Sequence, residues 1–131
     1  MSEATMTTEQ PPFVAEAGAA PMIVPATGAY LPPTAQVFFA VVSATGGLVR
    51  GGPHAVSATR LGTGIYQVLF DHDITGSAYM GTIGLTGSIG SSPAGEIAVV
   101  GRFGAANGVF VQTFNSAGAP TDLAFHLAVL S

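Results

Sequence analysis

Short apolar runs separated by glycine-rich stretches occupy the chain from Gln36 onward. The runs are rich in Val, Ile, Phe and Tyr, residues that favour strands, and they are shorter than an average helix. Glycine and asparagine between the runs, as in Gly62-Thr63-Gly64, provide the backbone conformations of tight turns. The pattern predicts seven strands, at residues 36–43, 55–60, 65–70, 78–85, 96–102, 109–114 and 123–130. We therefore expect an all-β fold, a compact β-sandwich or barrel of about seven or eight antiparallel strands.

Two of the predicted strands are apolar on both faces. Successive side chains on a strand point to opposite sides, so each strand carries two alternating sets. In residues 65–70 and 109–114 both sets are largely apolar, with Gln67 and Gln112 as the polar exceptions. A monomeric sandwich needs one apolar face per strand. The second apolar face favours contact with another chain. The alternative is that this face is exposed to solvent, as Gln67 and Gln112 would allow.

The first 35 residues differ in composition from the rest. They contain six of the nine prolines and three acidic residues but no basic one. Proline fixes φ, lacks a backbone N–H and biases the residue before it towards extended conformations. We expect residues 1–35 to form an extended Pro-rich N-terminal arm and residues 36–131 to form a β-sandwich or jelly-roll-like domain. A disordered linker is the alternative for residues 1–35.

Apolar positions within this arm are its candidate assembly contacts. Extended chain spans about 3.3 Å per residue, so an arm of this length can reach a neighbouring subunit. Apolar side chains seated in a neighbour's grooves would offset the entropy lost when the arm becomes ordered. The candidate contacts are Phe13, Val14, Met22, Ile23, Val24, Tyr30 and Leu31.

Charge is scarce in this sequence. Three Arg plus seven Asp or Glu make ten charged residues of 131, against about a quarter in an ordinary soluble domain. With 48% hydrophobic residues, too few charges remain to cover a monomer in the usual way, so part of the surface is expected to contact other protein. The net charge of −4 offers no basic stripe for a phosphate backbone, which argues against a nucleic-acid partner.

Membrane and export signals are not predicted either. The longest apolar runs are far shorter than the ~20 residues of a membrane-spanning helix. Acidic residues lie near the N-terminus, where a signal peptide has a basic stretch followed by an apolar core. We expect no membrane partner and no signal peptide. The chain has no cysteine, which excludes disulfides and thiolate metal ligands within it.

The densest polar cluster is Asp71-His72-Asp73. Strand alternation would place Asp71 and Asp73 on one face and His72 on the other. A Ca²⁺ site needs six or more oxygen ligands, and a Zn²⁺ site needs three or four ligands drawn from several places in the chain. The sequence therefore favours a turn in which the aspartates accept backbone hydrogen bonds, and neither a metal nor another cofactor is expected.

Other chemistry-bearing residues are dispersed along the sequence. His54 and His126 are each isolated, and His126 lies inside an apolar run, which favours structural roles. No serine lies in a Gly-x-Ser-x-Gly elbow, and the glycine-rich residues 81–87 lack the lysine of a phosphate-binding loop. Residues 84–95 are expected to form a flexible loop. No catalytic residue is identified, so the chain is not expected to be an enzyme.

The three arginines are expected to form ion pairs rather than to converge on a ligand, because acidic partners are available in the β domain. The arginines are Arg50, Arg60 and Arg102, and their candidate partners are Asp71, Asp73, Glu96 and Asp122.

Residues 38–51, with Gly46-Gly47, and residues 62–70 resemble a small β module that recurs in uncharacterised bacterial and phage proteins. The likeness continues through residues 78–84, 107–113 and 125–129 and covers about three quarters of the chain. The module often follows collagen-like or other extended segments, an arrangement similar to tail-fibre and trimeric head domains. Its members often carry cysteines at the positions of Ser77 and Ser131, so the resemblance implies that a family disulfide is lost here.

The sequence as a whole favours a structural assembly protein of a virus-like particle, such as a phage capsid decoration protein or a small tail protein. We expect it to form a homo-oligomer through its β domain, with a trimer as the favoured stoichiometry. The arm is expected to anchor it to other virion or shell proteins, and its location would be the virion, assembled in the host cytoplasm. The alternative function is a non-catalytic ligand- or glycan-binding β module.

Overall fold

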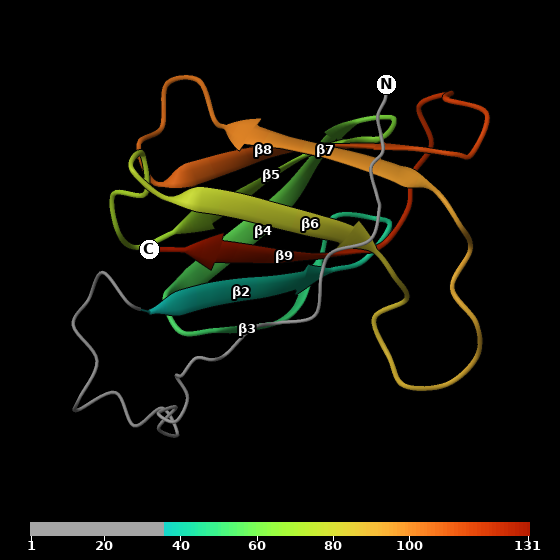
Figure 1. Ribbon diagram of the computed structural model, residues 1–131, viewed down its shortest axis with the longest axis horizontal. Helices are drawn as coiled ribbons and strands as arrows, with labels where there is room; N and C mark the ends of the chain where they lie inside the picture. Colours follow the sequence, from blue (N-terminus) through green and yellow to red (C-terminus); the bar gives the residue numbers. More distant parts are fainter. Residues whose placement is uncertain (1–35) are drawn as a thin grey trace, which may run out of the picture. The chain divides into compact units, whose positions relative to one another are not determined.

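Two four-stranded antiparallel sheets make up the part of the chain that the computed structural model describes, residues 36–131 (Figure 1). One sheet has the order β3-β2-β9-β6 and the other the order β4-β5-β8-β7. The strands are β2 (Val37–Val42), β3 (Leu48–Gly52), β4 (Ala55–Gly62), β5 (Ile65–Phe70), β6 (Ala78–Ile83), β7 (Glu96–Gly101), β8 (Gly108–Phe114) and β9 (Phe125–Leu130).

The all-β prediction is confirmed for residues 36–131, and the arrangement is a β-sandwich with two edge strands in each sheet. Residues 36–131 contain no helix. This part of the chain therefore has no helix that is long and apolar enough to cross a membrane. All seven predicted strands are present, with ends that differ by no more than two residues. The predicted arm lies outside the described residues and stays a prediction.

The eighth strand, β3, was not predicted. Its sequence ends in Gly51 and Gly52, and glycine is more common in turns than in strands. β3 pairs only with β2 and forms one edge of its sheet. Pairing with a buried neighbour therefore gives this segment a strand conformation that its own composition does not favour.

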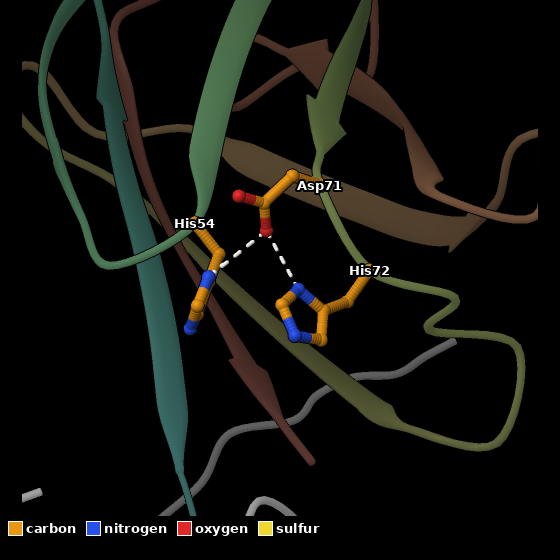
Figure 2. A group of neighbouring side chains, drawn as sticks. All are labelled: His54, Asp71 and His72. Atoms are coloured by element: carbon orange, nitrogen blue, oxygen red, sulfur yellow. Dashed lines mark hydrogen bonds and ion pairs between the residues drawn. The ribbon is translucent and has the colours of Figure 1, made fainter.

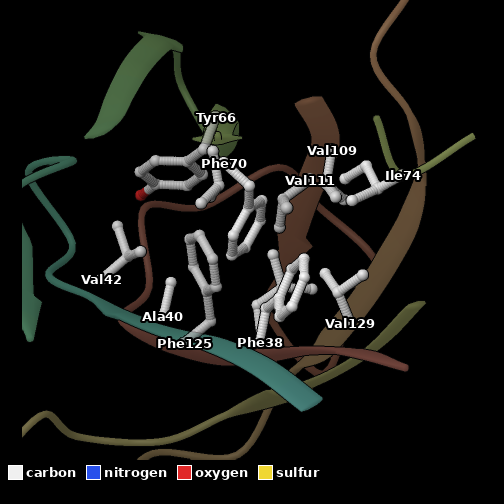
Figure 3. Packing of buried hydrophobic residues seen from close by; sticks show 12 residues of the cluster. Phe38, Ala40, Val42, Tyr66, Phe70, Ile74, Val109, Val111, Phe125 and Val129 are labelled. Carbon is white, nitrogen blue, oxygen red and sulfur yellow. The ribbon is translucent and has the colours of Figure 1, made fainter. Parts of the chain in front are cut away.

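The core lies between the two sheets and follows from strand alternation. On β5 the buried side chains are Tyr66, Val68 and Phe70, while the residues between them are partly exposed. β9 repeats the pattern with Phe125, Leu127 and Val129 buried. Figure 3 shows these side chains meeting those of β2 and β8 in the space between the sheets. The Tyr66 and Phe125 rings pack edge to face across this space, with centroids 5.1 Å apart.

Buried polar groups in the core are satisfied by backbone carbonyls. The Tyr66 hydroxyl donates to the carbonyl of Ala44 at 2.7 Å, and the Thr113 hydroxyl donates to that of Thr121 at 2.6 Å. Burial raises the pKa of the Tyr66 phenol, because the interior disfavours its charged form. These two bonds connect strand interiors to the loops that follow β2 and β8.

Asp122 links the β8–β9 connection to the β4–β5 turn. One carboxylate oxygen accepts the backbone N–H of Gly64 at 2.7 Å, and the other accepts the Arg60 Nε–H at 2.9 Å. The Gly64 hydrogen bond, followed by the Arg60 hydrogen bond, holds the pKa of Asp122 below its usual range. The ionised carboxylate is therefore the form that the folded state prefers.

Replacing Asp122 by asparagine is expected to lower stability at neutral pH and to matter less in acid. Because the pKa of Asp122 is lowered by folding, the stabilisation that its charge provides is present above the unfolded value of about 3.9. It is lost as the pH falls through the lower folded value, so the wild type and Asp122→Asn should converge there. Urea unfolding midpoints of both proteins between neutral pH and pH ~2.5 would show this, with Glu96→Gln as the control for loss of an exposed charge. A gap between the two midpoints that does not depend on pH would contradict the prediction.

Candidate functional site

The outward side of the β3-β2-β9-β6 sheet is apolar over three of its strands. The side chains that alternate with the core residues of β2, β9 and β6 point away from the other sheet. We call this set the apolar face, and none of its members carries a fixed charge. It consists of Val37, Phe39, Val41, Ala78, Met80, Thr82, His126, Ala128 and Leu130.

Strand register arranges the apolar face in rows and creates a groove. Phe39 on β2 and Met80 on β6 both lie opposite Ala128 on the central strand β9. A small residue between two large ones leaves a depression whose walls are Phe39 and Met80. The structure has a groove of 410 Å³ at this position, lined by residues of β2, β6 and β9. The next row, Val41, His126 and Thr82, continues the lining.

Three large side chains of the apolar face are unusually exposed for their type, whereas Val41 is buried. Met80 is 51% exposed, Val37 49% and Phe39 40%. Single exposed apolar residues are normal on protein surfaces, whereas contiguous exposed apolar groups are the kind of surface at which proteins often bind partners.

The β6–β7 loop, residues 84–95, is attached to the same sheet. His126 Nε2 lies 2.9 Å from the carbonyl oxygen of Leu85, and Arg50 on β3 donates to the carbonyl of Thr86 at 2.5 Å. The loop was predicted at this position, and no strand interrupts it between Ile83 and Glu96. Its first residues therefore lie beside the His126 row of the apolar face.

A second cluster brings together His54, Asp71 and His72 (Figure 2). Asp71 Oδ1 lies 2.9 Å from His54 Nδ1 and 2.6 Å from His72 Nδ1. The two imidazole rings are 4.2 Å apart between centroids, and the Phe38 ring packs against both. The hydrogen bond from His72, the largest contribution, and the nearby His54 lower the pKa of Asp71. The cluster is thus a carboxylate held between two imidazoles.

Local backbone geometry explains how the cluster forms. β5 ends at Phe70, so Asp71 and His72 lie in a bend where strand alternation no longer applies. The alternation that would place His72 on the opposite face from Asp71 therefore does not hold, and the two side chains meet in the bend. Asp73 instead accepts the backbone N–H and the hydroxyl of Thr75, at 3.0 and 2.7 Å, which lowers its pKa and confirms the predicted capping turn for this residue.

His54 is the member of the cluster that the sequence analysis missed. It lies in the two-residue connection between β3 and β4, and its carbonyl accepts the backbone N–H of Asp71 at 2.9 Å. A signal for it exists in the sequence. The predicted strands 55–60 and 65–70 flank a glycine-containing tight turn, which brings the chain before residue 55 near the chain after residue 70. In the structure Ala55 lies opposite Phe70, although the register shifts twice along the pair.

The three arginines do not converge, and only one of them forms the predicted ion pair. Arg60 pairs with Asp122 at 2.9 Å. Arg102 instead donates to the side-chain oxygen of Gln67 at 2.7 Å and lies over the Phe110 ring, while Arg50 binds the Thr86 carbonyl. The ion pairs predicted for Arg50 and Arg102 with Asp71, Asp73, Glu96 or Asp122 are therefore wrong, because within residues 36–131 carbonyl and amide oxygens are the partners of these two side chains.

The seven predicted assembly contacts lie outside residues 36–131, and their role stays a prediction. They are Phe13, Val14, Met22, Ile23, Val24, Tyr30 and Leu31.

Comparison with protein-family models finds no match, and comparisons with curated proteins and with solved structures find none either. The resemblance to a phage-associated β module stays a prediction. The function of the chain is therefore inferred from its own residues and contacts.

Proposed function

We propose that this chain is a non-catalytic structural component that assembles with copies of itself, and that the apolar face is one half of the contact between copies. The observation that carries the proposal is the groove between Phe39 and Met80, whose lining residues carry no fixed charge. Arg50 on β3, which pairs with Val41, is the one fixed charge that borders it among residues 36–131. Interface centres are depleted of charged residues and enriched in aromatic residues and methionine. The composition of the apolar face fits this description.

A second copy is the occupant that the surface chemistry favours. The face offers apolar side chains and few polar groups, so it suits a partner that is itself apolar and poor in charge. This chain meets that requirement, since 48% of its residues are hydrophobic and 8% are charged. Burial of apolar area stabilises association by roughly 25 cal/mol per Å² before the costs of binding are subtracted.

A closed trimer is the proposed stoichiometry. A ring of three requires two different patches on each subunit, whereas a twofold dimer uses the same patch twice. Apolar side chains are also exposed on the edge strands of the other sheet, where Val56 and Leu61 lie on β4 and Val100 lies on β7. Val56 and Leu61 lie on one edge of that sheet and Val100 on the opposite edge, outside the apolar face, and the second patch of the ring would be drawn from one of these edges.

The wider role we propose is that of a capsid decoration protein or a small tail protein of a virus-like particle. Sparse charge and a Pro-rich N-terminal region with spaced apolar residues support this role. Residues 1–35 would anchor the oligomer to other shell or tail proteins. This part of the proposal rests on the sequence.

A glycan- or ligand-binding module is the rival function, and the structure offers little to support it. A sugar platform uses aromatic rings with free polar edges beside convergent hydrogen-bonding groups. Both tyrosines in the described part of the chain direct their hydroxyls to backbone carbonyls, Tyr66 to Ala44 and Tyr79 to Ile74. The groove itself is lined mainly by apolar residues, with Thr82 and His126 as its polar side chains.

The substitution Met80→Glu is expected to convert the oligomer into a monomer. Met80 is 51% exposed in the single chain, so glutamate is tolerated there by the isolated fold. In a contact between the apolar face and the second patch of a neighbouring copy, the new carboxylate would be buried without a partner, which is strongly unfavourable. Light scattering coupled to size exclusion should give three times the 13.1 kDa chain mass for the wild type and one chain mass for Met80→Glu.

Phe103→Glu is the matched control. Phe103 is 93% exposed in the β7–β8 turn, away from the apolar face, so this variant also replaces an apolar side chain by a charge. It should keep the wild-type mass, and circular dichroism should show all three proteins folded. A monomeric wild type would overturn the proposal, and a Met80→Glu variant with the wild-type mass would show that the apolar face is not the contact.

A further inference from the structure

We propose that His54, Asp71 and His72 form a binding site for a divalent transition-metal ion, with Zn²⁺ as the ion that suits it best. The proposal is independent of self-association. Three donor groups from two separate segments converge here, and their ligating atoms all lie within 4.8 Å of one another.

The orientation of the two imidazoles is the first argument. Both histidines direct Nδ1, rather than an edge carbon, at the same carboxylate oxygen, at 2.9 and 2.6 Å (Figure 2). Without a metal, each Nδ1 must carry a hydrogen to make this contact. A metal ion that takes the place of these two hydrogens would be bound by two nitrogens and one oxygen.

The distances fit after a small adjustment. Zinc bonds to histidine nitrogen and to carboxylate oxygen are about 2.0–2.2 Å long, which separates tetrahedral ligand atoms by roughly 3.4 Å. The present contacts would have to widen by about 0.5–0.8 Å. Asp71 and His72 are about half exposed, with side-chain exposures of 53% and 49%, so rotation of their side chains can supply this change.

Packing behind the cluster fixes the histidine positions from the other side. The ring of Phe38 on β2 lies 4.7 Å from the His54 ring and 5.5 Å from the His72 ring between centroids. The backbone bond from Asp71 N–H to the His54 carbonyl ties the two segments together at 2.9 Å. The donors are therefore partly ordered before any ion binds, which reduces the entropy cost of binding.

The residue at position 54 is itself unusual. His54 has φ = 72°, and the other five positive-φ residues within 36–131 are all glycine. An imidazole at such a position costs stability relative to glycine. A ligand role gives a physical reason for histidine at this turn.

The donor set selects the class of ion. Two imidazoles and one carboxylate suit Zn²⁺, Co²⁺, Ni²⁺ or Cu²⁺, whereas Ca²⁺ takes six to eight oxygen ligands and Mg²⁺ six. Asp73 is committed to Thr75 and adds no oxygen to the site. Three protein ligands leave the fourth tetrahedral position to water. The bound ion would connect the β3–β4 connection to the end of β5 and stabilise that end of the sandwich.

Titration of the full, tag-free chain with ZnCl₂ by isothermal calorimetry would test the site, with thermal unfolding as a second measurement. We expect one Zn²⁺ per chain, an unfolding temperature that rises with Zn²⁺ concentration, and tetrahedral d–d absorption bands when Co²⁺ is used instead. His72→Gln should weaken binding by at least ~10- to 100-fold, the range found even for loss of second-shell partners. His54→Asn should do the same, and asparagine tolerates the positive φ.

His126→Gln is the matched control, because His126 is the third and last histidine of the chain and lies on the apolar face. This variant should bind Zn²⁺ as the wild type does. Folded wild-type protein that gives no binding heat and no rise in unfolding temperature would overturn the proposal. Equal Zn²⁺ affinity in the wild type and His72→Gln would overturn it as well, since the ion would then be bound elsewhere.

Discussion

Replacing Phe125 by alanine is expected to lower the free energy of unfolding by about 3–5 kcal/mol. Phe125 is fully buried on β9 between Val42 and Ile83 in the sheet register, and its ring packs against Tyr66 of the opposite sheet. Removing the ring leaves a cavity at the point where the two sheets meet, because the strands on either side are paired and cannot close over it. Typical domains are stable by only 5–15 kcal/mol, so the loss is a large share of the total.

Denaturant unfolding followed by far-ultraviolet circular dichroism would measure this loss, since the chain has no tryptophan for fluorescence. The protein concentration has to be held fixed, because self-association couples stability to concentration. Phe103→Ala is the control: the same substitution at a residue that is 93% exposed should change stability by less than about 0.5 kcal/mol. Similar losses in the two variants would contradict the packing described for the core.

Local sequence patterns were sufficient to predict most of the strands. Residues 65–70 were predicted without error because β-branched and aromatic residues, the glycine-containing turn before them and the polar residues after them all agree there. β3 was missed because its two glycines favour a turn, and it becomes a strand only through pairing with β2. The choice between sandwich and barrel could not be made from local patterns, since it depends on which strands pair at the sheet edges.

The candidate sites depend on strand order and are harder to predict. Phe39, Met80 and Ala128 come from three distant segments, and nothing in their local sequence says that β9 lies between β2 and β6. The His54 cluster differs, because the tight turn predicted between residues 55–60 and 65–70 already brings the far ends of these two strands near each other, although the observed register shifts twice. Proximity of the two strands of one hairpin can thus be predicted from the sequence, whereas contacts across a whole sheet cannot.

The proposals for the two candidate sites can be tested independently of each other. The apolar face belongs to the outward side of one sheet, while the His54 cluster lies at the β3–β4 connection and the end of β5. Met80→Glu leaves all three proposed metal ligands in place, and His72→Gln leaves the apolar face unchanged. Failure of one proposal therefore does not imply failure of the other.

Replacing Gly64 by alanine is expected to lower the free energy of unfolding by two independent effects. Gly64 has φ = +66°, a left-handed conformation that costs an alanine about 1–2 kcal/mol. A Cβ at this position would also lie 2.5 Å from the carbonyl oxygen of Thr113 and 2.9 Å from the amide nitrogen of Thr121. Both contacts are backbone atoms, so β8 or the segment after it must move, at a further cost of roughly 1–3 kcal/mol.

Gly118→Ala separates these two effects. Gly118 also has a positive φ, of 86°, but a Cβ there would meet no atom within 4 Å. It should therefore lose only the roughly 1–2 kcal/mol of backbone strain. The larger loss in Gly64→Ala would arise because Gly64 donates its N–H to Asp122 and accepts the N–H of Thr113, so its displacement breaks both bonds. Equal unfolding midpoints for the two variants in urea would show that the β4–β5 turn can move away from β8 without cost, contrary to the close packing of these backbones.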